Sequence, residues 1–569
     1  MTDISEKTVI SEKTVTHPAP HRTHAVLNQS VPRTDVNEFL LDTVLAEGVA
    51  RHDADWATGE LTDIGELVGS AGFQHDAELA NTVIPELKTF DRWGNRIDEV
   101  EYHPSYHRII SAAVAHGAHT SAWENPKPGA NVARAAAFML FSQVEPGHAC
   151  PISMTHAVIP SLELQPDVAA LWTPRALSRS YTPELDAPGK ASAIFGMSMT
   201  EKQGGSDVRA NTTIAKPAGR GGPGADYLLT GHKWFCSAPM SDAFLVLAQA
   251  EGAAGEGLSC FLLPRILPDG TRNVFRIQRL KNKLGNKSNA SSEIELDGTV
   301  GTMIGEPGRG VRTIIEMVSQ TRLDCILGST AGMRQSVAEA VWHARHRSAF
   351  GAVLADQPAM TSVLADLALE SEAATITALR LARAQDNDAD EQEKAFRRLA
   401  TAVAKYWICR RGPHHSYEAL ECLGGNGYTE DFPLARRYRE QPVMAVWEGS
   451  GNVIALDVLR AMTREPDSVA AFDLEVNLAR GNNPVLDQHL DRVRRQLGEL
   501  ATLAPADAQL RARTVVEAMA LALQASLMVR YSPAASSEAF IAARLGEDRG
   551  HEYGTLPVGT DFAGILARA

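Results

Sequence analysis

Cysteine is scarce in this chain of 569 residues, and none of its six copies belongs to a CxxC pair. No histidine stands at the spacing of a zinc finger either. Structural metal sites and redox motifs need closely spaced ligands of this kind, so the sequence predicts no metal. Unpaired thiols are typical of a reducing compartment, and we therefore expect a cytoplasmic protein.

Three other features are missing or in short supply. No run of about 18 apolar residues is present, so the sequence predicts no transmembrane helix. The first residues lack the basic flank and the apolar core of a signal peptide. Positive charge is limited, because 55 Lys and Arg face 69 Asp and Glu for a net charge of −14. That balance argues against nonspecific attraction to nucleic acid or to an anionic membrane.

The length of the chain predicts several structural units rather than one core. Residues 1–25 hold two copies of ISEKTV and a His/Pro-rich stretch, which favours a disordered tail. We expect a helical domain over 26–190, a β-domain over 191–301, a helical bundle over 302–463 and an additional helical domain over 464–569. Because helices and strands come in blocks, the predicted fold class is multidomain α+β and not an alternating βαβ arrangement.

The strands predicted for the β-domain are short runs between turn residues, which is typical of a small sheet or barrel. They cover Ile194–Met199, Tyr227–Trp234, Phe244–Ala248, Leu258–Leu263, Val274–Ile277 and Glu293–Leu296. Three long helices are predicted for the bundle, over Val311–Ala349, Met360–Asp386 and Glu391–Arg411. We expect the third helix to stop at Gly412-Pro413, which is a strong helix-terminating pair.

One glycine-rich segment imitates a dinucleotide-binding motif. Gly219–Gly224 reads GRGGPG, but the dinucleotide fingerprint follows a strand and opens a helix. Here Lys216-Pro217 precedes the segment, Pro223 interrupts it, and a strand-like run follows. We therefore predict a surface loop.

Two segments have residues suited to an anion and to a flat ring. Met197–Asp207, MSMTEKQGGSD, leaves a predicted strand and enters a glycine turn, where Gly204-Gly205 lets backbone N–H groups approach an anion. Gly231–Ser237, GHKWFCS, is a predicted strand whose aromatic side chains are suited to flank a planar ring. Taken alone, the first is equally typical of a hairpin turn and the second of a core strand.

Three further segments lie in the second half of the chain. Arg347–Gln357, RSAFGAVLADQ, follows a helix and offers an arginine that can clamp a pyrophosphate, although helix C-termini favour arginine in any case. Leu423–Tyr428 reads LGGNGY. In Val446–Asn452, VWEGSGN, an apolar neighbour of Glu448 raises the pKa expected for its carboxyl, which suits a general base. A lone glutamate in such a turn is otherwise a solvated residue.

The order and spacing of these five segments resemble the acyl-CoA dehydrogenase family over about residues 100–462. The strings MTEKQGGSD, KLGNKSNASSE and VWEGSGN, with the C-terminal extension, resemble the AidB-type, alkylation-response branch of that family from about His24 onward. The resemblance implies an N-terminal helical domain, a middle β-domain and a C-terminal helical bundle. It also implies FAD as cofactor and a homotetramer in which FAD lies partly at a subunit contact.

The same resemblance assigns cofactor contacts residue by residue. The flavin and its pyrophosphate are assigned to Met197, Met199, Thr200, Gly205 and Ser206. The isoalloxazine is assigned to Phe235, Cys236 and Ser237, with Phe235 where the family usually has Trp. A neighbouring subunit would reach the FAD through Arg347, Phe350, Gln357, Gly424 and Gly425, although the spacing from Arg347 to Gln357 is one residue shorter than usual. The segment over the flavin and the adenosine phosphates would supply Val446, Trp447, Gly449, Ser450, Gly451 and Asn452.

Glu448 matches the catalytic base of the family, which removes an α-proton of an acyl-CoA while the β-hydride goes to the flavin. Arg322 matches a family arginine near the substrate. The resemblance therefore implies an FAD-dependent oxidoreductase that acts on the CH–CH bond of an acyl-CoA. We expect a short or branched acyl group, such as isovaleryl.

Two alternatives stay open. The AidB-type branch implies a protein that binds duplex DNA, with weak or vestigial dehydrogenase activity. Residues 464–569 hold 11 Arg, no Lys and 14 acidic residues, so the segment is not basic overall, and salt-bridged helix faces explain its arginines equally well. The arginine clusters that would meet DNA are Arg492, Arg494, Arg495, Arg511 and Arg513, with another at Arg436, Arg437 and Arg439. The second alternative is a flavin oxidase or monooxygenase on the same scaffold.

Overall fold

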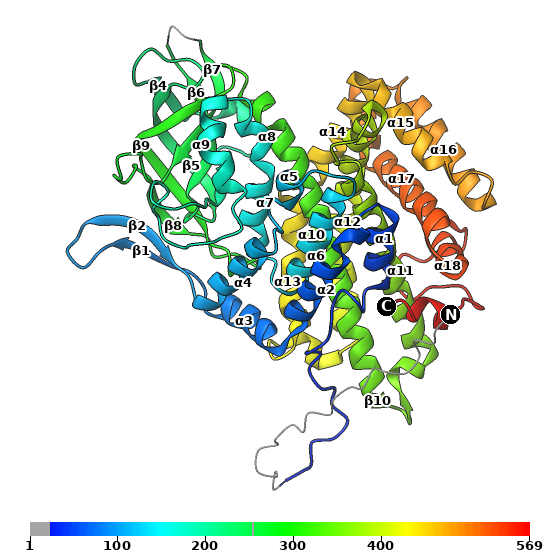
Figure 1. Cartoon of the computed structure of the whole chain (residues 1–569). Helices are drawn as coiled ribbons and strands as arrows, with labels where there is room; N and C mark the ends of the chain where they lie inside the picture. The colour runs from blue at the N-terminus through cyan, green and yellow to red at the C-terminus, as the bar shows by residue number, and fades with distance from the viewer. Residues whose placement is uncertain (1–22, 253–254) are drawn as a thin grey trace.

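The computed structural model describes residues 23–252 and 255–569, so nearly all of the proposed N-terminal tail, with its ISEKTV repeat, lies outside the described residues. The described chain forms a helical block, then a sheet, then a larger helical block (Figure 1). This order confirms the multidomain α+β class predicted from the sequence.

The first helical block is built around α6 (Ala130–Val144), in which every residue except Asn131 is buried. A helix that is apolar on all sides belongs in a core, and α6 packs against both α2 and the bundle helix α10. The other helices of the block are α1 (Thr43–Arg51), α2 (Thr58–Gly69), α3 (Ala71–Thr82), α4 (Pro104–Ala115), α5 (Ser121–Glu124), α7 (Ala149–Ala157), α8 (Ile159–Leu162) and α9 (Pro166–Ala176).

A β-hairpin, which the sequence analysis did not predict, interrupts this otherwise helical block. Strands β1 (Glu86–Phe90) and β2 (Arg96–Glu101) pair antiparallel and project from the body of the protein (Figure 1). Their turn is held by Asp91, whose carboxylate accepts hydrogen bonds from the backbone of Trp93 and Asn95, both at 2.9 Å. Gly94 supplies the positive φ that the turn needs. Asp91 and Gly94, which favour a tight turn, were the signal for this hairpin in the sequence.

The middle block is a seven-stranded sheet that closes on itself. Strands follow the order β3-β6-β4-β5-β9-β7, and an added β6–β7 pairing closes β6, β4, β5, β9 and β7 into a ring. Strand β3 pairs with β6 and β8 with β9 outside that ring. Closure leaves few free strand edges. The strands are β3 (Phe195–Ser198), β4 (Ile214–Pro217), β5 (Asp226–Ser237), β6 (Ala243–Ala250), β7 (Gly257–Pro264), β8 (Arg276–Leu280) and β9 (Ser291–Ile304). The six predicted strands are present, β4 was not predicted, and GRGGPG forms the loop between β4 and β5.

The second helical block is organised by α10 (Gly310–His346), a helix of 37 residues that contacts α6, α7, α11, α12 and α13. It therefore joins the first block, the sheet and the bundle. A short hairpin, β10 (Ser348–Ala349) with β11 (Ala352–Val353), follows it directly. The remaining elements are α11 (Pro358–Arg383), α12 (Glu391–Glu421), the 3₁₀ turn η4 (Gly424–Tyr428), α13 (Pro433–Val446) and α14 (Gly451–Arg464).

Helix α12 does not stop at Gly412-Pro413, as the sequence predicted, but continues to Glu421. Proline removes one helix hydrogen bond and crowds the preceding turn, which costs about 3 kcal/mol. Burial outweighs that cost, because His415, Ser416, Ala419 and Leu420 beyond the proline are all buried. Gly412 also has a packing role, since a Cβ there would lie 2.2 Å from Oε1 of Gln441 on α13.

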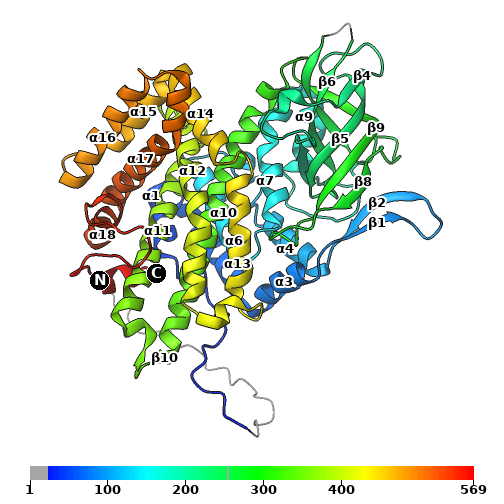
Figure 2. The same ribbon diagram turned by 180° about the vertical axis from the view of Figure 1, so that it is seen from behind.

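Five further helices cover one side of the bundle, opposite the sheet (Figure 2). They are α15 (Pro466–Asn477), α16 (Pro484–Leu500), α17 (Pro505–Tyr531), α18 (Ala534–Leu545) and α19 (Phe562–Leu566). By length and composition α17 would pass as a membrane span, and it is the one such helix in the described residues. However, 67% of its apolar window is buried inside the protein, as in a core helix.

Candidate active site

Glu448 lies in the tight turn that joins α13 to α14. Its φ is 57°, in the left-handed region that residues other than glycine rarely adopt, and Gly449 follows with φ 115°. Such a backbone costs of order 1–3 kcal/mol and tends to occur at functional sites. The turn is therefore held by contacts from outside it.

Two cations hold the Glu448 turn through its backbone. Arg322 of α10 donates from Nε to the carbonyl of Glu448 at 3.1 Å, and its Nη1 pairs with Asp457 of α14 at 2.7 Å. Lys405 of α12 donates to the carbonyl of Gly449 at 2.6 Å. Neither cation is bonded to the Glu448 carboxylate, so the turn is fixed while that carboxylate stays available.

The environment of Glu448 favours its neutral form. Burial raises the pKa of its carboxyl, against the opposing effects of a hydrogen bond from Thr321 and of the Arg322 and Lys405 charges. Cys150, at the start of α7, lies near both Glu448 and Ser237, and burial raises the pKa of its thiol to about 11. Cys150 was not singled out in the sequence, yet it marks where α7, the sheet and the Glu448 turn converge.

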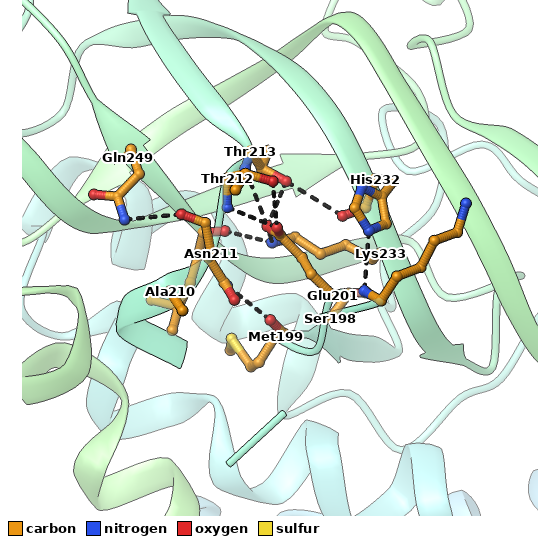
Figure 3. Close-up of polar contacts among 12 residues, drawn as sticks. Ser198, Met199, Glu201, Ala210, Asn211, Thr212, Thr213, His232, Lys233 and Gln249 are labelled. Atoms are coloured by element: carbon orange, nitrogen blue, oxygen red, sulfur yellow. Dashed lines mark hydrogen bonds and ion pairs between the residues drawn. The ribbon is translucent and has the colours of Figure 1, made fainter. Parts of the chain in front are cut away.

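The segment Met197–Asp207 is folded around the carboxylate of Glu201 (Figure 3). Glu201 accepts hydrogen bonds from the backbone and hydroxyl of Thr212, at 2.7 and 3.0 Å, and from those of Thr213, at 3.2 and 2.6 Å. Lys233 of β5 completes the set, with its ammonium 2.7 Å from Glu201 Oε1. The strand β5 is therefore tied to the loop by a buried ion pair.

Glu201 and Lys233 are both fully buried. Burial opposes ionisation of Glu201, but Lys233 and the threonine donors outweigh it and hold the pKa of the carboxyl at about 2. The sequence analysis missed this pair. Each motif carries more than one charged or polar residue, so nothing local marks Glu201 and Lys233 as the two that are buried and must therefore be paired.

The pair shapes the part of the loop predicted to meet a phosphate. The carbonyl of Thr200 accepts from the backbone N–H of Trp234 at 2.8 Å, which fixes the loop against β5. A Cβ on Gly205 would lie 2.7 Å from the Thr200 hydroxyl, so only glycine fits there. Ser206 is exposed, and Met197, Met199 and Thr200 are half-buried. The predicted contacts thus line the outer side of a rigid loop.

The three residues assigned to the flavin ring lie at the end of β5, and their side chains point to two different faces of the strand. Phe235 is 47% exposed, whereas Cys236 is fully buried, because successive side chains alternate across a strand. Burial raises the pKa of the Cys236 thiol to about 12. The side chain of Cys236 therefore faces the core and not the site. Ser237 lies on the Phe235 side, with its hydroxyl 3.1 Å from that of Ser291.

A second group of predicted cofactor residues lies at the opposite end of the bundle from α14 (Figure 1). Because a helix rises about 1.5 Å per residue, the path from Arg322 on α10 to Arg347, which directly follows its last residue, spans ~37 Å. Arg347 is bonded to the carbonyl of Asn28, and Asn426, beside Gly424 and Gly425, contacts the neighbouring Gln29 at 3.3 Å. Phe350, at the tip of the β10–β11 hairpin, is 100% exposed. Gln357 caps that hairpin through the carbonyl of Ala349, at 2.7 Å.

The start of α14 presents donors suited to a phosphate. A Cβ on Gly451 would lie 2.9 Å from Arg410 Nη1 and 3.3 Å from Arg513 Nη2. Arg513 of α17 also donates to the side chain of Asn452 at 2.8 Å. Two guanidinium groups therefore meet a helix N-terminus, where anions are favoured. Ser450 and Val446 are exposed beside them, and Trp447 is half-buried.

The arginines considered for DNA are only partly available. Arg494 makes two hydrogen bonds to Asp473, at 2.9 and 2.8 Å, and Arg513 is directed at α14 as described. Arg495 and Arg511 are exposed, and Arg492 is half-buried.

The cluster at Arg436, Arg437 and Arg439 is not a surface patch, which corrects the sequence analysis. Arg437 is 5% exposed and donates to the carbonyl of Gln143, and Arg436 donates to that of Val144 at 3.0 Å. Both carbonyls belong to the last turn of α6, where cations complement the helix dipole. Arg439 pairs with Glu430.

A cavity of about 150 Å³ opens beside the site. Pro151 and Ala238 on its wall directly follow Cys150 and Ser237 in the chain. Much of the remaining wall is aromatic, formed by Tyr102, Tyr106, His107 and Tyr181. Tyr102 and Tyr106 stack with ring centroids 4.5 Å apart. Lys190, Asp242 and Glu101 add charged groups to the same wall. The arrangement therefore combines a fixed carboxylate, a loop with donors suited to a phosphate, and a recess with a mixed aromatic and polar wall.

Three family models match the chain. Residues 28–183 match the adaptive response protein AidB N-terminal domain, 196–299 the acyl-CoA dehydrogenase middle domain, and 308–463 the acyl-CoA dehydrogenase C-terminal domain. The chain is 45% identical to AidB of Escherichia coli (strain K12) over 482 residues, which covers 84% of this chain and 87% of that protein. It is 29% identical to acyl-CoA dehydrogenase family member 11 of Caenorhabditis elegans, over 80% of this chain and 74% of that protein.

Solved structures agree with these matches. The Caenorhabditis elegans protein ACDH-11, solved in complex with C11-CoA, superposes with a TM-score of 0.82 at 26% identity and covers 96% of this chain and 97% of its own. The apo form of Bd2924 superposes with a TM-score of 0.79 at 29% identity, over 89% of this chain and 99% of its own. The chain therefore belongs to the acyl-CoA dehydrogenase family of FAD-dependent oxidoreductases that act on CH–CH donors, in its AidB-type branch.

Proposed function

We propose that this protein binds FAD and dehydrogenates an acyl-CoA between its α and β carbons, with Glu448 as the base. The observation that carries the proposal is the Glu448 turn, which is fixed through its carbonyls by Arg322 and Lys405. That arrangement leaves the carboxylate free to accept a proton, and burial raises its pKa toward neutrality, as a general base requires. FAD, when bound, would accept the hydride.

The residues present fit FAD. The loop around Thr200, Gly205 and Ser206 supplies hydroxyl and backbone donors on a rigid support, because Glu201 and Lys233 anchor it. Phe235 and Ser237 present an apolar face and a hydroxyl to a planar ring. Met197, Met199 and Trp447 would border the same ring. The start of α14, with Ser450, Gly451 and Asn452, would take a phosphate beside Arg513.

We propose a short or branched acyl group, such as isovaleryl, as the substrate's tail. The cavity beside Cys150 and Ser237 measures about 150 Å³, close to the size of an apolar cavity that holds a benzene ring. Steady-state dehydrogenation with an artificial electron acceptor, across a series of acyl-CoAs, tests this assignment. Turnover is expected to peak with short or branched thioesters. Equal inactivity of the whole series would overturn the proposed function.

We also propose that FAD is completed by a second copy of the chain, as in a homotetramer. Arg347 lies about 37 Å along the bundle from Arg322, so one chain does not bring it to its own Glu448. Phe350 and Gln357 belong to the hairpin region that follows Arg347, and Gly424 and Gly425 lie beside Asn426, which contacts Gln29 next to the Arg347 partner Asn28. A fully exposed phenylalanine at a hairpin tip is typical of a contact surface.

Phe350→Asp is therefore expected to reduce the assembled mass and to lower the FAD content per chain. Light scattering after gel filtration and the flavin absorbance measure the two quantities. Trp93→Asp is the matched control, because Trp93 is 79% exposed and lies in the turn of a different hairpin, β1–β2. An unchanged mass and FAD content for Phe350→Asp would refute the shared site.

Binding of duplex DNA remains the alternative, supported by the AidB N-terminal match and by the identity to Escherichia coli AidB. Arg495 and Arg511 are the exposed arginines that would carry it. Binding through phosphates must weaken as salt rises, so a salt-independent binding curve, or no binding at all, would exclude DNA binding.

For either function we propose a cytoplasmic location, because all six cysteines are free.

A further inference from the structure

Lys283 belongs to the string KLGNKSNASSE, to which the proposed function assigns no role. It lies in the loop between β8 and β9 and donates from Nζ to the carbonyl of Asn289 and, at 3.1 Å, to the hydroxyl of Ser291. Ser291 begins β9, and its hydroxyl lies 3.1 Å from that of Ser237 on β5. A continuous hydrogen-bonded chain therefore joins Lys283 to the hydroxyl proposed to meet the flavin ring.

The Lys283 ammonium lacks an ion pair in the described part of the chain. The titratable groups that face it are Cys150, Glu440 and Glu145. Both carboxylates are engaged elsewhere. Glu440 accepts the backbone and side-chain amide of Asn286, at 2.7 and 3.2 Å.

The Glu145 carboxylate accepts more hydrogen bonds than that of Glu440. Its carboxylate accepts from Asn81 at 3.0 Å, from Ser288 at 2.5 Å, and from the backbone of Gly147 and His148, at 3.1 and 2.7 Å. Lys283 is half-buried, and this loss of solvent lowers the pKa of its ammonium to about 8. A cation partly withdrawn from water and without an ion pair favours a counter-charge, which a molecule bound at the site would supply.

The direction of the hydrogen bonds follows from the chemistry of the groups. An ammonium only donates, so Ser291 accepts from Lys283 and turns its own O–H toward Ser237. Ser237 then accepts from Ser291 and donates its own O–H elsewhere, and the acceptors on that side are the Cys150 thiol and the proposed flavin ring. A positive charge at the far end of such a chain favours electron-rich atoms at the near end.

We propose that Lys283 is a positioning residue that acts through Ser291 and Ser237 to orient a donor toward the flavin ring and to stabilise the ring's reduced form. The proposal rests on the proposed function, because it requires FAD beside Ser237. It adds an electrostatic element to the site that acts on the cofactor and is independent of the base Glu448.

Removing the charge should make the flavin harder to reduce. A unit charge ~10 Å away at an effective dielectric of about 20 changes a reduced-to-oxidised ratio roughly tenfold. For Lys283→Met this corresponds to a two-electron midpoint potential about 30 mV lower than in the unaltered protein. The potential of the unaltered protein should also fall further as pH rises through the Lys283 pKa, whereas the Lys283→Met potential should lack that added step.

The experiment measures the midpoint potential of the FAD-loaded protein against a reference dye, from neutral pH to well above the Lys283 pKa. Lys287→Met, in the same loop, is the control and should leave the potential unchanged. Ser291→Ala, which keeps the ammonium but breaks the chain, should shift the potential in the same direction as Lys283→Met. Combining the two substitutions should add less than the sum of their separate shifts, because they interrupt one chain.

Unaltered potentials in both Lys283→Met and Ser291→Ala, with FAD bound, would refute the role of Lys283 and leave the proposed function intact. If Lys283→Met fails to retain FAD, the Ser291→Ala potential decides the question by the same criterion. Failure of the unaltered protein to bind FAD would instead refute the proposed function, and this proposal with it.

Discussion

Replacing Glu448 by Gln is expected to lower turnover of the best acyl-CoA by roughly 10²–10⁴-fold, the range that a positioned base contributes. The amide keeps the shape of the side chain but cannot accept the α-proton. The backbone of the turn should persist, because Arg322 and Lys405 bind carbonyls and not the carboxylate. FAD content should therefore stay unchanged, and steady-state kinetics with an artificial electron acceptor measures the loss.

The pH dependence separates a base from a merely structural residue. A base works only when ionised, so activity falls as pH falls through its pKa. Burial raises the pKa of Glu448, and the acid limb of kcat/KM should therefore lie above the ordinary carboxyl range. The residual activity of Glu448→Gln should lack this limb. Glu499→Gln, at an exposed site on α16, serves as the control. Full activity in Glu448→Gln would remove Glu448 from the mechanism.

Replacing Lys233 by Met is expected to lower the free energy of unfolding by about 3–5 kcal/mol, as measured for buried ion pairs that lose one partner. The substitution leaves Glu201 as an unpaired buried charge, since both side chains are fully inaccessible. The loop around Thr200 should loosen with it, so FAD should bind more weakly. Chemical denaturation and FAD titration measure the two effects.

The double variant Glu201→Gln with Lys233→Met is the matched control for that prediction. The single glutamine oxygen can still accept from Thr213, while its amide NH2 group faces the donors of Thr212 and loses those bonds. No buried charge remains, so part of the lost stability should return. If the single and double variants are equally unstable, the charge is not the cause.

Stability at acid pH tests the same pair. The pKa of Glu201 is held at about 2, below its ordinary value of 4.5. A lowered carboxyl pKa stabilises the folded protein above the ordinary value, and the contribution is lost as pH falls from there toward 2. Glu201→Gln should lose less stability than the unaltered protein over this window. Identical acid-unfolding profiles of the two proteins would contradict the assignment.

Local patterns in the sequence predicted the block order and most strands, because short apolar runs and turn residues report backbone preferences directly. They also placed Glu448 in its turn. The pairing of Glu201 with Lys233 was not predicted, because it joins two motifs through the closure of a sheet. Arg437 was misplaced for the same reason. In the sequence its charge predicts a surface position, but the packing of α13 against the last turn of α6 buries it.

One local rule was outweighed by tertiary packing, and one motif was divided by strand alternation. Pro413 ends a helix by backbone chemistry, but the residues beyond it are buried, and α12 continues. Cys236 sits in a motif with Phe235 and Ser237, yet strand alternation turns its side chain to the core. Motif spacing also does not show the distance along α10 between Arg322 and Arg347, which together with the exposed Phe350 supports a second copy of the chain at the site.

The central claim is that FAD on this protein takes electrons from an acyl-CoA, and one measurement tests it most directly. The visible absorption of the purified protein is recorded without oxygen, before and after addition of isovaleryl-CoA and a few straight-chain acyl-CoAs. We predict a flavin spectrum that bleaches rapidly with one short or branched thioester, and far more slowly in Glu448→Gln. A flavin spectrum that persists with every thioester, or the absence of any flavin spectrum after reconstitution with FAD, would contradict the account.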